Sequence, residues 1–293
     1  MTRIEGRIVR GIAGFYYVAT EHGIVECRAR GKFRKDNITP LVGDIVEIQM
    51  INDSEGYILN ILPRKNELTR PPVANVDQAI IVFAIVRPEL NRVLLDKMIV
   101  LAESNDIEPV ICINKVDLKE DREAFDLVTI YQKIGYKAVA TSTVTKEGIE
   151  ELKSYLKDKV SFFAGPSGVG KSSLINSIQS NIKLKTGEVS EKLLRGRHTT
   201  RSVELLSLDF GGYVLDTPGF TALTLDIAKE DLRYYFKEFL ELQKGCKFSS
   251  CLHVNEPDCN VIKAVEEGLI DKNRYLSYLS LLKELKEKEK RRY

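Results

Sequence analysis

The feature that most constrains the fold is a glycine-rich octapeptide in the middle of the chain. It fits the pattern G-x-x-x-x-G-K-[ST] and consists of Gly165, Pro166, Ser167, Gly168, Val169, Gly170, Lys171 and Ser172, with Ser173 directly after it. Residues 159–164 predict a short buried strand before it, and residues 173–178 predict a helix after it. In that context backbone N–H groups can surround a pyrophosphate, Lys171 can reach its β and γ phosphates, and Ser172 can hold Mg²⁺. We predict a nucleoside triphosphate site, for which this loop leaves ATP and GTP open.

A second motif lies upstream, where a predicted strand over residues 109–114 ends. It consists of Asn114, Lys115, Val116 and Asp117. Asp117 can accept hydrogen bonds from N1–H and N2–H₂ of guanine, whereas adenine offers neither donor, so the motif predicts GTP. Asn114 can tie this loop to the phosphate loop, and Lys115 can lie along the base. Alone, the tetrapeptide fits equally well a strand-to-helix turn with an aspartate near the N-cap.

Predicted strands and helices alternate through the centre of the chain. The strands cover 78–86, 109–114, 137–141 and 160–164, and the helices cover 91–104, 121–134 and 149–156. This alternation predicts a parallel sheet with helices on both faces and ligands at the carboxyl ends of the strands. Thr141, Ser142 and Thr143 stand at one such end, where a backbone N–H can meet guanine O6.

Two segments after the phosphate loop carry the other candidates for the nucleotide site. The first runs from Arg195 to Arg201, and one of its threonines, Thr199 or Thr200, can complete the Mg²⁺ shell and sense the γ-phosphate. In the second, Asp216 ends an apolar run and is followed by Thr217, Pro218 and Gly219. Asp216 can hold Mg²⁺ through water, and Gly219 can donate its N–H to the γ-phosphate.

The first sixty or so residues show a different pattern of short alternating runs separated by turn residues. Five strands are predicted there, which favours a small OB-type barrel of the kind that binds single-stranded nucleic acid. A basic stretch in this region contains Arg28, Arg30, Lys32, Phe33, Arg34 and Lys35. Phosphate contacts and base stacking can combine there, so we predict RNA binding, with a solvated polar hairpin as the alternative. Residues 63–72 are predicted to be a linker.

Three of the five cysteines gather near the C-terminal end of the chain, in a region that otherwise predicts helices. With one histidine they form the set Cys246, Cys251, His253 and Cys259. Three thiolates and one imidazole suit a closed, structural Zn²⁺ site, with scattered unliganded cysteines as the alternative. Cys27 and Cys112 are predicted to be core residues. The last eleven residues hold six cations and three glutamates, which fits either a solvated end or an RNA-facing one.

Composition adds limits but no function of its own. Of the 293 residues 43% are apolar and 29% charged, the net charge is +2, and the longest apolar run has eight residues. A bilayer span needs about 20, so we expect a cytoplasmic protein without a membrane partner. A nucleic-acid partner cannot be inferred from this charge balance and depends on the local clusters.

In this order the motifs are those of a circularly permuted GTPase, because Asn114 to Asp117 precede the phosphate loop. The whole chain resembles the RsgA (YjeQ/YloQ) family of small ribosomal subunit biogenesis GTPases. The resemblance implies ribosome-stimulated GTP hydrolysis, late in the maturation of the 30S subunit, by a cytoplasmic protein. Phe220 occupies the position where Ras-like proteins have a water-orienting glutamine. The resemblance points instead to His198 as the residue that positions water, and an RNA contact is the alternative role for His198.

We therefore expect an OB-fold RNA-binding domain at 1–64, a permuted GTPase domain at 65–223 and a helical zinc-binding domain at 224–293. The expected partners are the small ribosomal subunit, its rRNA and GTP or GDP, and the chain is expected to be a monomer. One rival interpretation is an RNA-binding zinc protein with a vestigial nucleotide site. Another, an ATP-driven transporter or kinase subunit, predicts a preference for ATP, which Asp117 opposes.

Overall fold

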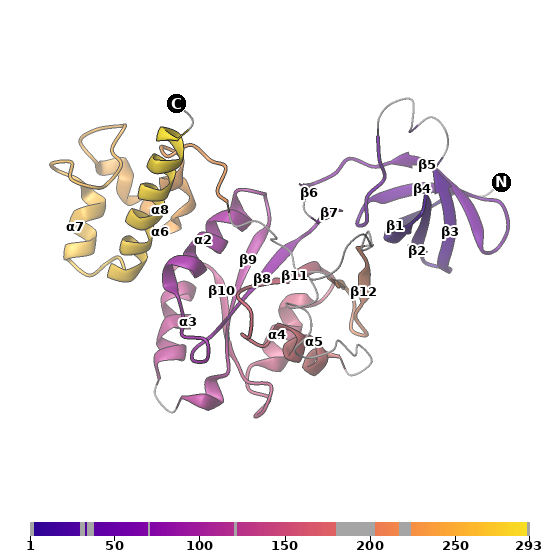
Figure 1. Cartoon of the computed structure of the whole chain (residues 1–293), viewed down its shortest axis with the longest axis horizontal. Helices are drawn as coiled ribbons and strands as arrows, with labels where there is room; N and C mark the ends of the chain where they lie inside the picture. The colour runs from indigo at the N-terminus through magenta and orange to yellow at the C-terminus, as the bar shows by residue number, and fades with distance from the viewer. Residues whose placement is uncertain are drawn as a thin grey trace.

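The computed structural model describes residues 3–29, 33, 38–69, 71–119, 122–179, 203–216 and 224–291. They form a β-barrel at the N-terminal end, a sheet covered by helices in the middle and a group of helices at the C-terminal end (Figure 1). The predicted fold class, with a barrel, a central α/β part and a helical C-terminal part, is confirmed. No helix in these described ranges is long and apolar enough to cross a membrane.

The N-terminal barrel is closed by five strands in the order β1-β2-β3-β5-β4. They are β1 (Arg3–Ile12), β2 (Phe15–Thr20), β3 (Gly23–Ala29), β4 (Ile45–Met50) and β5 (Glu55–Ile61). Side chains alternate across each strand, so one set fills the barrel, including the fully buried Ile8, Val18, Ile48 and Ile58. A parallel pairing of β3 with β5 completes the ring, which confirms the five-stranded barrel.

The segment predicted to be a linker contains a small antiparallel pair, β6 (Glu67–Thr69) and β7 (Pro72–Ala74). The linker prediction for residues 63–72 is wrong in this respect. Leu68 and Val73 are register partners and are 5% and 0% exposed, so the pair buries apolar surface that a linker would leave in solvent. Pro72 is the first residue of its strand, a position that tolerates a missing N–H.

The central sheet has six strands in the order β10-β9-β8-β11-β13-β12. They are β8 (Gln78–Ala84), β9 (Glu108–Asn114), β10 (Lys137–Thr141), β11 (Val160–Ala164), β12 (Leu205–Ser207) and β13 (Tyr213–Leu215). All neighbours are parallel except β12, which is antiparallel to β13. Strands β10, β9, β8 and β11 lie within two residues of their predicted ranges.

Helices cover both faces of this sheet, as the alternating pattern predicts. One core combines alternate strand residues with α2 (Arg92–Glu103) and α3 (Glu123–Ile134). The opposite face packs on α4 (Ile149–Leu156) and α5 (Lys171–Ile178), and Cys112 lies in that core. Cys27 is fully buried in the barrel, so both predicted core cysteines are core residues. Every strand residue of β8 is buried, as expected for a strand covered on both sides.

The C-terminal part is helical and packs on α2 (Figure 1). It consists of η2 (Leu232–Tyr235), α6 (Lys237–Leu240), η3 (Leu242–Gly245), α7 (Asn260–Glu266) and α8 (Lys272–Lys290). Its core is built around Phe236, Phe239 and Tyr278, whose ring centroids lie 5.0 to 5.3 Å apart. Val100 and Leu101 of α2 belong to the same apolar cluster. Helix α2 therefore packs against the central sheet on one side and against the C-terminal helices on the other.

Candidate functional site

The phosphate loop connects the end of β11 to the start of α5, as its sequence pattern requires. Gly165, Gly168 and Gly170 have φ values of +141°, +80° and +97°, a region that side chains disfavour. A Cβ atom on Gly165 would lie 2.0 Å from the Val82 carbonyl oxygen, and one on Gly170 would lie 2.4 Å from Asn114 Nδ2. The glycines therefore let the loop fold closely against β8 and the end of β9, with helix α5 beginning where the loop ends.

Lys171 stands at the start of α5 and folds back over this loop. Its Nζ donates hydrogen bonds to the carbonyl oxygens of Gly165, at 2.8 Å, and Pro166, at 2.7 Å. Burial lowers the pKa of the Lys171 ammonium, and no carboxylate in the described part of the chain offsets this effect. A phosphate group would supply the missing negative charge, so the loop fits a bound nucleoside triphosphate. Ser172 and Ser173 follow in the same helical turn.

The guanine motif lies beside the phosphate loop, because β9 and β11 flank β8 in the sheet. Asn114 ends β9, and its Nδ2 donates to the Val169 carbonyl at 2.9 Å. The Thr141 hydroxyl donates to Asn114 Oδ1 at 3.0 Å. One buried amide thus ties together the ends of β9 and β10 and the phosphate loop.

Lys115 and Asp117 then extend from this fixed point. Lys115 adopts a left-handed conformation with φ +64°, and its Nζ donates to the carbonyl oxygens of Gly168, at 2.7 Å, and Arg87, at 2.5 Å. The exposed Asp117 accepts a 2.5 Å hydrogen bond at Oδ1 from the Ser142 hydroxyl. The hydroxyl is itself oriented by the N–H groups of Val144 and Thr145, each at 3.1 Å. The carboxylate that would read guanine is therefore held by a side chain from the next strand.

The structure gives Thr141 and Ser142 roles that differ in detail from the sequence expectation. We expected a backbone N–H of Thr141, Ser142 or Thr143 to meet guanine O6, and no contact among the described residues tests this for Thr143. The Thr141 side chain is fully buried against Asn114 and Cys112, and the Ser142 N–H donates to the Glu147 carbonyl at 3.0 Å. Their hydroxyl groups orient the guanine motif, and nothing in the local sequence pattern signals this.

Asp216 follows β13, the parallel neighbour of β11, so it emerges at the same edge of the sheet as the phosphate loop. Its N–H donates to the Glu204 carbonyl at 3.0 Å, and its Oδ1 accepts from the Glu204 N–H at 3.1 Å. The donor set formed by Ser172 and Asp216 is a hydroxyl and a carboxylate, which suits Mg²⁺. His198, Thr199, Thr200 and Gly219 lie outside the described residues.

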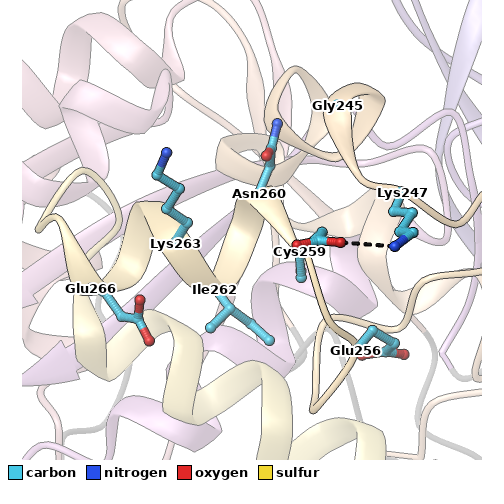
Figure 2. A pocket seen from close by; sticks show the side chains of 9 residues that line it. Gly245, Lys247, Glu256, Cys259, Asn260, Ile262, Lys263 and Glu266 are labelled. Carbon is cyan, nitrogen blue, oxygen red and sulfur yellow. Dashed lines mark hydrogen bonds and ion pairs between the residues drawn. The ribbon is translucent and has the colours of Figure 1, made fainter.

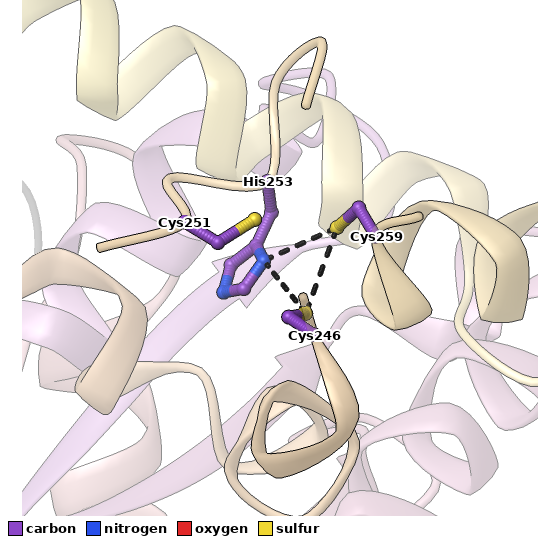
Figure 3. A group of neighbouring side chains, drawn as sticks. All are labelled: Cys246, Cys251, His253 and Cys259. Carbon is purple, nitrogen blue, oxygen red and sulfur yellow. Dashed lines mark hydrogen bonds between the residues drawn. The ribbon is translucent and has the colours of Figure 1, made fainter. Parts of the chain in front are cut away.

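The predicted zinc ligands converge in the C-terminal part (Figure 3). The candidate ligand atoms of Cys246, Cys251, His253 and Cys259 all lie within 4.8 Å of one another. The Cys246 and Cys259 sulfurs are 3.9 Å apart, and His253 Nδ1 is 3.7 and 3.3 Å from them. Tetrahedral zinc, with bonds of about 2.3 Å to sulfur and about 2.0 Å to nitrogen, places sulfurs about 3.8 Å apart and a sulfur about 3.5 Å from a nitrogen. The cluster therefore fits a structural zinc ion.

Protonation favours the same assignment. Burial lowers the pKa of His253 to about 4, so its ring is neutral at physiological pH and Nδ1 offers a lone pair. Burial raises the pKa of the Cys251 thiol to about 12, so a thiolate there needs a compensating cation such as Zn²⁺. With four protein ligands no position is open for a catalytic water.

Glu256 supports this cluster, and the sequence pattern does not reveal it. Its carboxylate accepts hydrogen bonds from the N–H groups of Leu252, Val254 and Asn255 at 2.8, 2.7 and 3.1 Å. Burial alone would raise the Glu256 pKa, but these backbone donors outweigh it and lower the pKa. The loop that carries His253 is thereby fixed by an ionised side chain. Beside it lies an open groove of about 640 Å³ with both acidic and basic walls, including an ion pair between Lys247 and Asp258 (Figure 2).

The basic stretch of the barrel is only partly described, and it corrects one expectation. Phe33 is 6% exposed and belongs to the main apolar core, so it is not placed for base stacking as we predicted. An aromatic side chain in a connection next to a barrel gains more by closing the barrel core than by facing solvent. Arg28 is exposed, with its guanidinium carbon 4.5 Å from the centroid of the Phe15 ring. Arg30, Lys32, Arg34 and Lys35 lie outside the described residues.

The order of these motifs along the chain and their shared place in the sheet define the class of protein. A phosphate loop and a guanine motif share one edge of a mostly parallel sheet, with the guanine motif first in sequence, between a barrel and a zinc-binding helical part. This is a circularly permuted GTPase. Residues 61–226 match the family described as RsgA GTPase, and residues 5–58 match the RsgA N-terminal domain. The chain belongs to the RsgA family and is a GTP hydrolase that uses Mg²⁺ with GTP.

Individual relatives are similar over their whole length. A protein of Caldanaerobacter subterraneus subsp. tengcongensis named small ribosomal subunit biogenesis GTPase RsgA is 77% identical, with 100% of this chain and 99% of that protein covered. The crystal structure of YjeQ from Thermotoga maritima matches with a TM-score of 0.86 and 46% identity, covering 97% of this chain and 99% of that one. YloQ, described as a circularly permuted GTPase, matches with a TM-score of 0.82 and 41% identity, covering 98% and 96%.

Proposed function

We propose that this GTPase acts in the late maturation of the small ribosomal subunit, binding the 30S subunit and hydrolysing GTP there. The observation that carries the proposal is the relative with 77% identity across both chains, which is named for small ribosomal subunit biogenesis. The rival function, an RNA-binding protein with a vestigial nucleotide site, is disfavoured by the intact hydrogen-bond network around Lys171, Asn114 and Asp117. We further propose a cytoplasmic monomer with domains at 1–64, 65–223 and 224–293.

In the proposed nucleotide site the phosphate loop, residues 165–173, surrounds the phosphates, with Lys171 on the β and γ groups. Asp117 reads the guanine edge, and Asn114, Lys115, Val116, Thr141 and Ser142 shape and orient its pocket. Ser172 and Asp216 would hold Mg²⁺, which would supply positive charge to neutralise the phosphates. For the remaining roles we propose Thr199 or Thr200 at the metal and γ-phosphate, Gly219 as a γ-phosphate donor, and His198 as the residue that orients the attacking water.

The barrel is proposed to contact rRNA through its outer face. Arg28 stacks on Phe15 and is the register partner of Tyr57 on β5, whose side chain is 41% exposed. A guanidinium stacked on one aromatic ring, with a second exposed aromatic residue on the neighbouring strand, suits both phosphate contact and base stacking. Arg30, Lys32, Arg34 and Lys35 are proposed as further phosphate contacts.

Cosedimentation with purified ribosomal subunits tests this function. The chain should sediment with small subunits and not with large subunits, and a non-hydrolysable GTP analogue should strengthen the interaction relative to GDP. Arg28→Ala should weaken it and lower the slope of log affinity against log salt by about one. Equal binding to both subunits in both nucleotide states would reject the proposed function.

A further inference from the structure

The barrel touches the central domain at a point where the first strand departs from regular pairing. The register of β1 with β2 shifts between Ile8 and Arg10, which leaves Val9 unpaired. Beyond this bulge the backbone of Arg10 makes an isolated antiparallel bridge with Glu204, which directly precedes β12. Val9 and Val203 are 7% and 8% exposed and lie in the same apolar core. The contact is therefore part of a packed junction between the two domains.

The backbone of Glu204 also contacts Asp216, a residue of the proposed nucleotide site. It exchanges two hydrogen bonds with Asp216, at 3.0 Å from the Asp216 N–H and at 3.1 Å to Asp216 Oδ1. The pair continues the antiparallel ladder of β12 and β13, in which Leu205 is opposite Leu215. One residue thus links the backbone of the barrel to the carboxylate proposed for magnesium.

Glu204 and Asp216 are also close in sequence to the residues proposed to act in GTP hydrolysis. Glu204 comes four residues after Thr200, at the end of the segment that carries His198, Thr199 and Thr200. Asp216 comes directly before Thr217, Pro218 and Gly219. Glu204 and Asp216 are therefore close in sequence to the two segments with the proposed catalytic groups, and their two mutual hydrogen bonds would carry a shift of Glu204 to Asp216.

The side chains at the junction form a contact that can change without unfolding the protein. Arg10 Nη1 lies 3.8 Å from Glu204 Oε1, and these side chains are 36% and 38% exposed. The Tyr17 ring holds the Arg10 guanidinium carbon 4.2 Å from its centroid. Exposed ion pairs of this kind contribute little to folding stability, so this pair adds little to the stability of the junction. It is suited to respond when a ligand on the barrel shifts β1 or β2.

We propose that Glu204 is a positioning residue for GTP hydrolysis, which ties Asp216 to Arg10 of the barrel. Binding of the small subunit to the barrel then sets the geometry of the hydrolytic site through the Arg10–Glu204 contact. This inference rests on the proposed function and adds the route by which the ribosome acts on the nucleotide site.

The test compares full-length, zinc-loaded variants. Arg10→Met removes the charge and keeps the stem, Arg10→Lys keeps the charge, and the pair Arg10→Glu with Glu204→Arg reverses the contact. Arg3→Met is the matched control. Arg3 lies on β1, like Arg10, but its ion pair with Glu47 of β4, at 3.4 Å, stays within the barrel. Three quantities are measured: kcat with saturating small subunits, the subunit concentration at half-stimulation, and hydrogen exchange of the Glu204 and Asp216 amides without ribosomes.

Arg10→Met should lower the stimulated kcat about two- to fivefold, leave the half-stimulating concentration and the unstimulated rate unchanged, and speed exchange of the two amides by a similar factor. Arg10→Lys and the reversed pair should recover most of the difference. An Arg10→Met protein that matches Arg3→Met in stimulation and exchange overturns the inference. So does a loss confined to the half-stimulating concentration, because Arg10 would then only bind the subunit. A wild-type protein that small subunits fail to stimulate contradicts the proposed function instead, and the amide exchange still decides the inference.

Discussion

Arg274→Met should destabilise the junction between the central domain and the C-terminal helices far more than its position on a helix suggests. The Arg274 side chain is 2% exposed, and Nη1 donates to Asp96 Oδ1 of α2 at 2.5 Å. Its Nε and Nη2 donate to the two carboxylate oxygens of Glu238 at 2.8 and 3.1 Å. Tyr131 also donates to Asp96, at 2.7 Å. Without Arg274 two carboxylates would remain in a buried site with no ion-pair partner among the described residues.

Breaking a buried ion pair on one side costs about 3 to 5 kcal/mol, because the other charge stays desolvated. We expect a loss of this size in the unfolding free energy. Adding Asp96→Asn should cost less than the sum of the two single changes, by about 1 kcal/mol or more. Lys97→Met is the matched control, since Lys97 pairs with Glu284 between the same two helices at 2.6 Å, with Glu284 46% exposed. That control should lose no more than about 1 kcal/mol.

The assay is urea unfolding of the zinc-loaded protein, followed by tyrosine emission because the chain has no tryptophan. Burial raises the pKa of Asp96, and Arg274 opposes that rise. In Arg274→Met the pKa of Asp96 should rise further. The loss of unfolding free energy relative to the wild type should therefore be largest at neutral pH and shrink as falling pH protonates Asp96. A loss equal to that of Lys97→Met, or a deficit that grows on acidification, would refute the reasoning.

Three further predictions concern the two sites. Cys246→Ser should abolish the one zinc ion per chain, measured by atomic emission, and lower the unfolding temperature of the C-terminal helices; retained zinc would contradict the four-ligand site. Asp117→Asn should weaken GTP binding about 100-fold or more and favour xanthosine triphosphate, because O2 of xanthine can accept a hydrogen bond from the asparagine amide. Unchanged affinities for both nucleotides in a fluorescent nucleotide titration would argue against Asp117 as the residue that recognises guanine. Gly165→Ala should destabilise the fold by about 1 to 3 kcal/mol, because its Cβ would approach the Val82 carbonyl oxygen to 2.0 Å at φ +141°, and wild-type stability would show that the loop adapts.

Features written in short stretches of sequence could be predicted well. The phosphate loop, the guanine motif and the cysteine-histidine set each depend on neighbouring residues, so their spacing alone carries the chemistry. The alternation of apolar segments gave the parallel sheet with covered faces, since a strand such as β8 must be apolar on both sides. The order of the motifs along the chain then indicated the permutation.

Features that depend on partners far away in sequence could not be predicted. Arg274 and Asp96 are 178 positions apart, and each lies on a helix where a charged residue normally faces solvent. The contact of Arg10 with Glu204 joins two domains, so no local pattern marks it. Phe33 follows from the same limit, because its basic neighbours suggested an exposed loop while the barrel core took up the ring.

The most direct test is GTP turnover by the wild-type chain with and without purified small ribosomal subunits. Hydrolysis should rise by about an order of magnitude or more when small subunits are added, should not rise with large subunits, and should be lost in Lys171→Ala. ATP should not replace GTP. A turnover rate that small subunits leave unchanged, or that persists in Lys171→Ala, would contradict the proposal that this GTPase hydrolyses GTP in response to the ribosome.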